Sequence, residues 1–230
     1  MNKLDISKFQ NVKWVAHRGI PSKTYENTIT GFKIAAELPY WGIETDVHET
    51  HDDKYIIHHD DFVNFEDKQL FIDKLDSSFL RTIKFNNGDT LPFLSEYIEI
   101  CKTSNKVAVV ELKAPFTSLK IKKILAEIES LNYLDKTVII SFYFDNVYQT
   151  RSLNKDIPIQ LLLGEWNKDV IDVASKLKID INTHYSLLTK ERVDELHNNG
   201  QLVNCWTVNE PDVALKLIEM GVDFITTDGF

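Results

Sequence analysis

Residues 42–60 read Gly-Ile-Glu-Thr-Asp-Val-His-Glu-Thr-His-Asp-Asp-Lys-Tyr-Ile-Ile-His-His-Asp, two extended segments in which carboxylates and imidazoles are concentrated. Glu44 and Asp46 lie two positions apart in the first segment. In a strand both carboxylates would therefore leave the same face, roughly 7 Å apart at the backbone. Two carboxylates packed together without a cation repel each other, and one would have to take up a proton. This pair fits one hard cation, with a solvated acidic hairpin as the alternative.

The second segment, Tyr55–Ile57, leads directly into His58 and His59. Adjacent residues of a strand face opposite sides, so only one of these histidines can reach the site of the acidic pair. Counting along the strand puts His59 on the face of Ile57 and turns His58 away. We therefore expect His59, and not His58, to face the acidic pair.

Composition limits the classes of protein to which the chain can belong. Its 230 residues, 43% of them hydrophobic, suit one barrel-sized α/β domain spanning residues 1–230, and the oligomeric state stays open. The net charge of -9 argues against nucleic acid as a partner, since phosphate backbones require a basic face. Cys101 and Cys205 lack the spacing of a zinc site and are expected to be reduced core thiols. Met1–Phe9 has no apolar run, so we expect no signal peptide, no membrane insertion and a cytoplasmic location.

Strands and helices are expected to alternate along most of the chain. The expected strands begin at Val12, Ile43, Val107, Thr137, Ile159, Ile179, Leu202 and Phe224, with Tyr55–Ile57 as an additional hairpin arm. Helices between them carry apolar stripes, as in Leu119–Leu131. Eight such units predict a closed (β/α)₈ TIM barrel, with a doubly wound open sheet as the alternative. The pattern breaks down at about residues 60–92, which we interpret as a small insertion after the second strand, with helical turns.

Polar side chains gather at the carboxyl ends of the expected strands, where barrel enzymes carry their active sites. These residues are His17, Arg18, Glu44, Asp46, Glu111, Lys113, Trp206 and Asp228. Three carboxylates, from Glu44, Asp46 and Glu111, match a hard divalent cation such as Mg²⁺ or Ca²⁺ better than zinc. The sequence therefore predicts a metal site at this rim.

Two histidines beside such a metal suit general acid/base catalysis, because imidazoles titrate near neutral pH. We expect His17 and His59 in this role, and Arg18 and Lys113 as contacts to phosphate oxygens. The other histidines at positions 48, 51, 184 and 197 carry no companion motif and are expected at the surface or in packing. Together these residues indicate phosphoryl chemistry.

The same residues resemble the glycerophosphodiester phosphodiesterase family, over nearly the whole chain and in order. The resemblance rests on His17-Arg18-Gly19, Glu26-Asn27-Thr28, Glu44-x-Asp46-Val47, Thr50-x-Asp52, His59-Asp60, Glu111-x-Lys113, Trp206-Thr207-Val208-Asn209 and Gly221-Val222-Asp223 with Thr227-Asp228. It implies a distorted TIM barrel, hydrolysis of glycerophosphodiesters to glycerol 3-phosphate and an alcohol, and Trp206 in the wall of the substrate site. Departures from the family pattern, such as Asp53 in place of a turn glycine, surround the insertion and concern the leaving group.

Two other functions are alternatives to this one. A phospholipase D-like enzyme acting on lysophospholipid or sphingomyelin would have a wide apolar mouth and an export signal. A catalytically silent barrel that binds phosphorylated ligands would have lost one of the two histidines or one of the three carboxylates. This sequence has all five residues.

No Ser, Cys or Thr stands beside a base in the rim motifs, so we expect no covalent enzyme intermediate. The substrate itself offers a nucleophile, the 2-hydroxyl of its glycerol, and attack by this hydroxyl would produce a cyclic phosphate.

Overall fold

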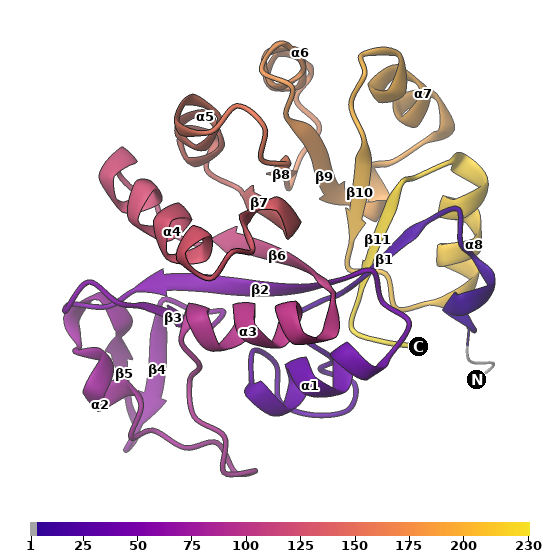
Figure 1. Ribbon diagram of the computed structural model, residues 1–230. Helices are drawn as coiled ribbons and strands as arrows, with labels where there is room; N and C mark the ends of the chain where they lie inside the picture. The colour runs from indigo at the N-terminus through magenta and orange to yellow at the C-terminus, as the bar shows by residue number, and fades with distance from the viewer. Residues whose placement is uncertain (1–3) are drawn as a thin grey trace.

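The computed structural model describes residues 4–230 and contains a closed barrel of eight parallel strands ringed by helices (Figure 1). The barrel strands are β1 (Lys13–Ala16), β2 (Gly42–Glu49), β6 (Val107–Leu112), β7 (Thr137–Ser141), β8 (Ile159–Leu163), β9 (Asp180–His184), β10 (Val203–Trp206) and β11 (Phe224–Thr227). The ring closes because β1 pairs with both β11 and β2. The predicted TIM barrel is confirmed, and closure excludes the open sheet.

Each barrel strand except the last, β11, is followed by one helix, either directly or after an excursion. These helices are α1 (Ile29–Glu37), α3 (Leu94–Ser104), α4 (Ser118–Ser130), α5 (Phe144–Leu153), α6 (Lys168–Lys176), α7 (Lys190–Asn198) and α8 (Pro211–Met220). Short 3₁₀ turns occur at Ile6–Lys8, Ile72–Lys74, Leu134–Lys136 and Tyr185–Leu187. The apolar stripe predicted for α4 is buried. Helix α4 thus buries one apolar face in the core.

Helix α1 begins where its sequence supplies a cap. Thr28 accepts a hydrogen bond from the amide of Gly31, so Thr28 is the N-cap, and the neighbouring Asn27 is left for another role. Gly19, in the loop before α1, has a φ of +83°, and a Cβ there would lie 3.0 Å from the carbonyl carbon of Gly31. Only glycine allows this close approach of loop and helix, which fixes the residues that follow β1.

The chain leaves the barrel between β2 and α3. Strand β3 (Tyr55–Ile57) runs back antiparallel to β2, and a hairpin of β4 (Phe62–Phe65) and β5 (Lys68–Phe71) follows, with the short helix α2 (Ser77–Leu80). Figure 1 shows this excursion to one side of the barrel. The expected helical turns occur at Ile72–Lys74 and in α2, and the hairpin adds two strands that we did not expect.

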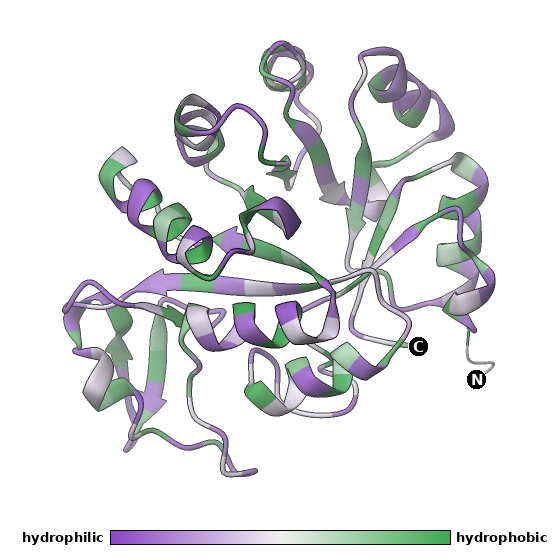
Figure 2. Ribbon diagram, viewed as in Figure 1, coloured by the Kyte–Doolittle hydropathy of each residue, from purple (hydrophilic) through white to green (hydrophobic). Residues whose placement is uncertain are grey.

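The barrel interior contains both an apolar cluster and buried polar side chains such as Gln160 and Asn182. The apolar cluster comprises Val15, Val109, Val138, Ile140 and Leu162. Strand β2 does not share the apolar character of most other barrel strands. Its residues are hydrophilic along much of its length (Figure 2), although all except Glu49 are buried. Such burial of polar groups requires partners, and the partners of β2 form the candidate site.

Both cysteines are free and buried, as predicted. No helix within residues 4–230 is both long enough and apolar enough to cross a bilayer. The prediction that Met1–Phe9 is not a signal peptide falls partly on residues 1–3. These residues lie outside the part of the chain that the structure describes.

Candidate active site

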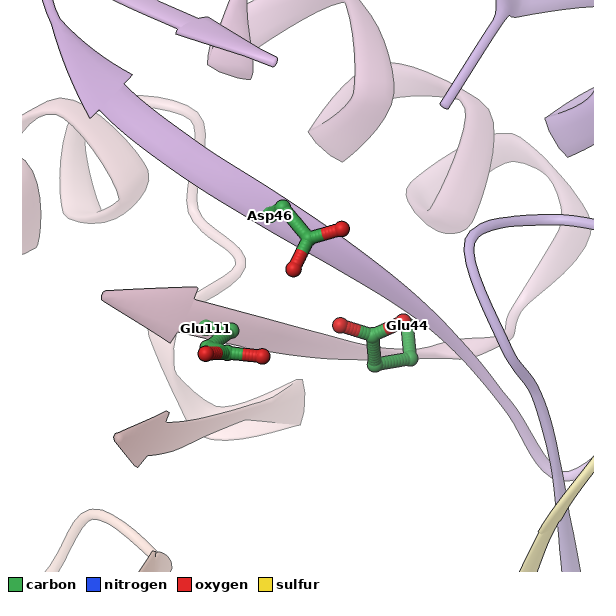
Figure 3. Close-up of side chains that lie close together, drawn as sticks. All are labelled: Glu44, Asp46 and Glu111. Carbon is green, nitrogen blue, oxygen red and sulfur yellow. The ribbon is translucent and has the colours of Figure 1, made fainter. Parts of the chain in front are cut away.

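Three buried carboxylates meet at the carboxyl ends of β2 and β6. Glu44 and Asp46 extend from β2, and Glu111 extends from β6, where it is the register partner of Asp46 (Figure 3). One carboxylate oxygen from each residue lies within 4.8 Å of the other two. Spacing by two residues along one strand and parallel pairing with the next strand bring the three groups onto one wall of the barrel.

These carboxylates strongly perturb one another. Burial and repulsion from Asp46 and Glu111 raise the pKa of Glu44 well above its ordinary value. Burial and Asp46 raise the pKa of Glu111 to about 7. Burial also acts against ionisation of Asp46, but Lys113, Arg18 and a hydrogen bond from Asn27 keep its pKa below the ordinary value. Without a further cation, the cluster therefore retains protons near neutral pH.

The donor set fits a divalent cation. All three residues offer carboxylate oxygens, the ligands that hard cations prefer. Asp46 Oδ1 is buried and accepts no hydrogen bond from the described residues, although Lys113 Nζ forms an ion pair with it at 3.4 Å. A buried acceptor without a donor is costly, and a cation within the cluster would satisfy it.

Arg18 contacts three carboxylates, two of which belong to the cluster. Its backbone amide donates to Glu44 Oε2 at 2.8 Å, its Nε lies 3.3 Å from Asp46 Oδ2, and its Nη1 pairs with Glu26 at 3.0 Å. Burial disfavours its charge, but these carboxylates raise the pKa of Arg18 above its ordinary value. Its guanidinium is therefore a fixed positive charge beside the cluster.

Lys113 supplies the second positive charge. Its Nζ lies 3.2 Å from Glu111 Oε1 and 3.4 Å from Asp46 Oδ1. Burial opposes its charge, but Asp46 and Glu111 raise the pKa of Lys113 above its ordinary value. As the i, i+2 spacing predicted, Glu111 and Lys113 face the same cavity.

His17 and His59 line this cavity, which has a volume of about 190 Å³. Its full lining is His17, Arg18, Glu44, His59, Glu111, Lys113, Ile140, Phe142, Leu162, Asn182, Trp206, Thr207 and Thr226. His58 is not part of the lining, as the strand parity predicted. Seven of the eight predicted site residues therefore line one cavity. The eighth, Asp46, is not in the lining but belongs to the carboxylate cluster.

Each histidine of the cavity has a carboxylate at Nδ1. His17 Nδ1 lies 2.7 Å from Asp228 Oδ1, and His59 Nδ1 lies 2.8 Å from Asp60 Oδ1. A carboxylate acceptor favours a proton on Nδ1 and leaves Nε2 for exchange with a substrate. Burial opposes ionisation of Asp228, but its hydrogen bonds with His17 and with Asn209 keep its pKa below the ordinary value.

Three supporting residues were not assigned to the site from the sequence. Asn27 donates from Nδ2 to Asp46 Oδ2 at 2.7 Å, and Asn209 donates to Asp228 Oδ2 at 2.6 Å. His48, expected at the surface or in packing, is buried, and its Nε2 lies 3.2 Å from the carbonyl oxygen of His59. The signal for His48 was present in the sequence, since it continues the i, i+2 series of Glu44 and Asp46 on the inner face of β2.

Comparison with known proteins agrees with this geometry. The model of the glycerophosphoryl diester phosphodiesterase family matches residues 17–230. A glycerophosphodiester phosphodiesterase of Caldanaerobacter subterraneus subsp. tengcongensis is 30% identical over an alignment of 230 positions, gaps included, which covers 93% of each chain. The crystal structure of a glycerophosphodiester phosphodiesterase from Parabacteroides distasonis superposes with a TM-score of 0.84 at 28% identity, over 95% of this chain and 93% of that one.

A further structure, an Oleispira antarctica phosphodiesterase in complex with its product sn-glycerol-3-phosphate, shares the fold. Its TM-score is 0.83 at 23% identity, over 94% of this chain and 92% of that one. The fold, the retained motifs and the match over nearly the whole sequence lead to one conclusion. This chain belongs to the glycerophosphoryl diester phosphodiesterase family, a family of phosphoric diester hydrolases.

Proposed function

We propose that the protein hydrolyses glycerophosphodiesters to glycerol 3-phosphate and an alcohol, and that it requires a divalent cation. One observation carries the proposal: two histidines, each with a carboxylate at Nδ1, face a single cavity whose wall holds three buried carboxylates. The names of the relatives support this substrate class. The predicted cytoplasmic location and single-domain organisation remain predictions.

Glu44, Asp46 and Glu111 would hold the cation, with Mg²⁺ and Ca²⁺ as the candidates because all three ligands are carboxylates. When bound, such an ion supplies Lewis-acid stabilisation of negative charge on a phosphate oxygen. Arg18 and Lys113 line the same cavity as permanent positive charges, and they would bind the other phosphate oxygens and stabilise charge that develops during the reaction.

The histidines would move protons in opposite directions. One Nε2 takes the proton of the 2-hydroxyl as its oxygen forms a bond to phosphorus, and the other imidazolium protonates the leaving alkoxide as its bond to phosphorus breaks. This step releases the alcohol and leaves a cyclic phosphate. In the second step the roles reverse: water loses a proton as it attacks phosphorus, the ring opens at the 2-oxygen, and that oxygen is protonated. Asp228 and Asp60 hold both rings in the required tautomer.

Substitution of the histidines tests the assignment of the acid/base pair. His17→Ala and His59→Ala should each lower kcat for glycerophosphocholine by about 10²–10⁴-fold, the usual effect of losing one acid/base group. His58→Ala is the matched control, because this neighbouring histidine does not line the cavity, and its activity should stay within a few-fold of wild type. An inactive His58→Ala beside an active His59→Ala would show that the pair is misassigned.

Removing the 2-hydroxyl tests the cyclic route. The 2-deoxy analogue of glycerophosphocholine keeps the phosphate and the leaving group, so it should bind as a competitive inhibitor but release no choline. Glycerol 1,2-cyclic phosphate should in turn be hydrolysed by the enzyme. Choline release from the deoxy analogue at a rate similar to that from the natural diester would mean that water attacks phosphorus directly.

A second candidate function, hydrolysis of lysophospholipid, is favoured by the aromatic rim that follows β7. Phe142, Tyr143 and Tyr148 are each two-fifths or more exposed, and Phe142 both lines the cavity and packs edge-to-face on Trp206 at 5.6 Å. Exposed aromatic side chains beside a site suit an apolar ligand.

Rates on glycerophosphocholine and lysophosphatidylcholine, measured side by side with Phe142→Ser, separate the two functions. The proposed function predicts a preference for glycerophosphocholine that Phe142→Ser leaves in place. A preference for the lysophospholipid that Phe142→Ser abolishes would instead establish the second function.

A further inference from the structure

Two residues that line the cavity opposite the carboxylates each have one buried polar atom without a hydrogen-bond partner among residues 4–230. These atoms are Oδ1 of Asn182, on β9, and Nε1 of Trp206, on β10. Asn182 is only 2% exposed, and both residues line the active-site cavity. In the ring of eight strands, β9 stands opposite β2 and β10 stands opposite β6. The pair therefore faces the carboxylate cluster across the barrel.

The Asn182 amide belongs to a chain of hydrogen bonds that crosses four neighbouring strands, β8 to β11. Its Nδ2 donates to Gln160 Oε1 at 3.0 Å, and the same oxygen accepts from Asn204 Nδ2 at 2.9 Å. Asn204 Oδ1 in turn accepts from Thr226 Oγ1 at 3.2 Å. With Gln160 and Asn204 in these orientations, rotating the Asn182 amide alone by half a turn would oppose its oxygen to Gln160 Oε1, so Oδ1 is the atom left over.

The unpartnered pair consists of one acceptor and one donor, which is the complement of a hydroxyl group. A hydroxyl donates one hydrogen bond and accepts others, whereas a phosphate oxygen could satisfy only Trp206 and an alkyl group neither atom. Buried polar groups without partners are costly, so a ligand that satisfies them is favoured over one that does not. This wall is therefore built for a hydroxyl-bearing part of the substrate.

On the proposed function, only one hydroxyl of the glycerol part of the substrate is free for this role. The 2-hydroxyl is engaged by a histidine as the attacking group, and the oxygen of the leaving alcohol is esterified to phosphorus. We propose that Asn182 Oδ1 and Trp206 Nε1 bind the terminal, non-esterified hydroxymethyl group of the glycerol, so that these two residues determine specificity for glycerol over other vicinal diols. This inference rests on the proposed function.

The test uses an analogue of glycerophosphocholine in which propane-1,2-diol replaces glycerol, because it lacks the terminal hydroxyl and keeps the attacking 2-hydroxyl. The wild-type enzyme should show kcat/KM at least about 10²-fold lower for the analogue, since sites built to bind a hydroxyl strongly reject substrates without one. Asn182→Leu should lose activity mainly on glycerophosphocholine, so that the ratio of the two kcat/KM values falls toward one. Trp206→Phe keeps a ring while removing the donor, and it should lower the same ratio.

Asn204→Leu is the matched control, because it also removes an amide from Gln160 but has no unpartnered atom and does not line the cavity. Its selectivity ratio should stay closer to that of wild type than the ratios of Asn182→Leu and Trp206→Phe, whatever its absolute rate. Thermal unfolding shows whether each variant folds, and Trp206→Phe decides the question if Asn182→Leu does not fold. Unchanged selectivity in folded Asn182→Leu and Trp206→Phe would overturn the inference, as would equal wild-type rates on both substrates. A wild-type enzyme that hydrolyses neither substrate would instead contradict the proposed function.

Discussion

The mutual repulsion of three buried carboxylates is the constraint on which the rest of the site depends. Asp46 and Glu111 are paired across β2 and β6, and Glu44 lies two residues away on the same face, so the backbone gives none of them room to withdraw. Two cations, Arg18 and Lys113, offset only part of this charge, because the pKa values of Glu44 and Glu111 remain raised. A protein keeps such an arrangement when the unbalanced charge serves to bind a cation.

The surrounding structure holds the carboxylates in place from the outside. The amide of Arg18 and the side chain of Asn27, which follow β1, both donate to carboxylates of β2. Their loop is held against α1 by Gly19, whose positive φ and close packing on Gly31 exclude a side chain. On the far side of the cavity, the amides of Gln160, Asn182 and Asn204 form a fixed hydrogen-bonded layer. The cavity therefore has a charged wall that faces neutral residues, of which Asn182 belongs to this amide layer.

The sequence predicted the barrel and the content of the site because both depend on local patterns. Apolar strands alternating with amphipathic helices fix the topology, and spacing by two residues fixes which side chains share a face, including the choice of His59 over His58. The β4–β5 hairpin was missed because Glu66 and Asp67 adopt positive φ without a glycine to signal the turn. The bond between His17 and Asp228 joins residues 211 positions apart, and no local pattern could reveal that pair.

Binding of a divalent cation, with release of protons, tests whether the carboxylate cluster is a metal site. Calorimetric titration of the chelator-treated protein with Mg²⁺ or Ca²⁺ at pH 7, in two buffers of different ionisation enthalpy, measures both the affinity and the protons released. We expect one ion per chain and a net release of protons, because the raised pKa values of Glu44 and Glu111 leave protons for the ion to displace. Glu111→Gln should bind the ion more weakly and release fewer protons. Absence of binding would contradict a metal site at this cluster. Binding that releases no protons and is equally tight in Glu111→Gln would contradict it as well.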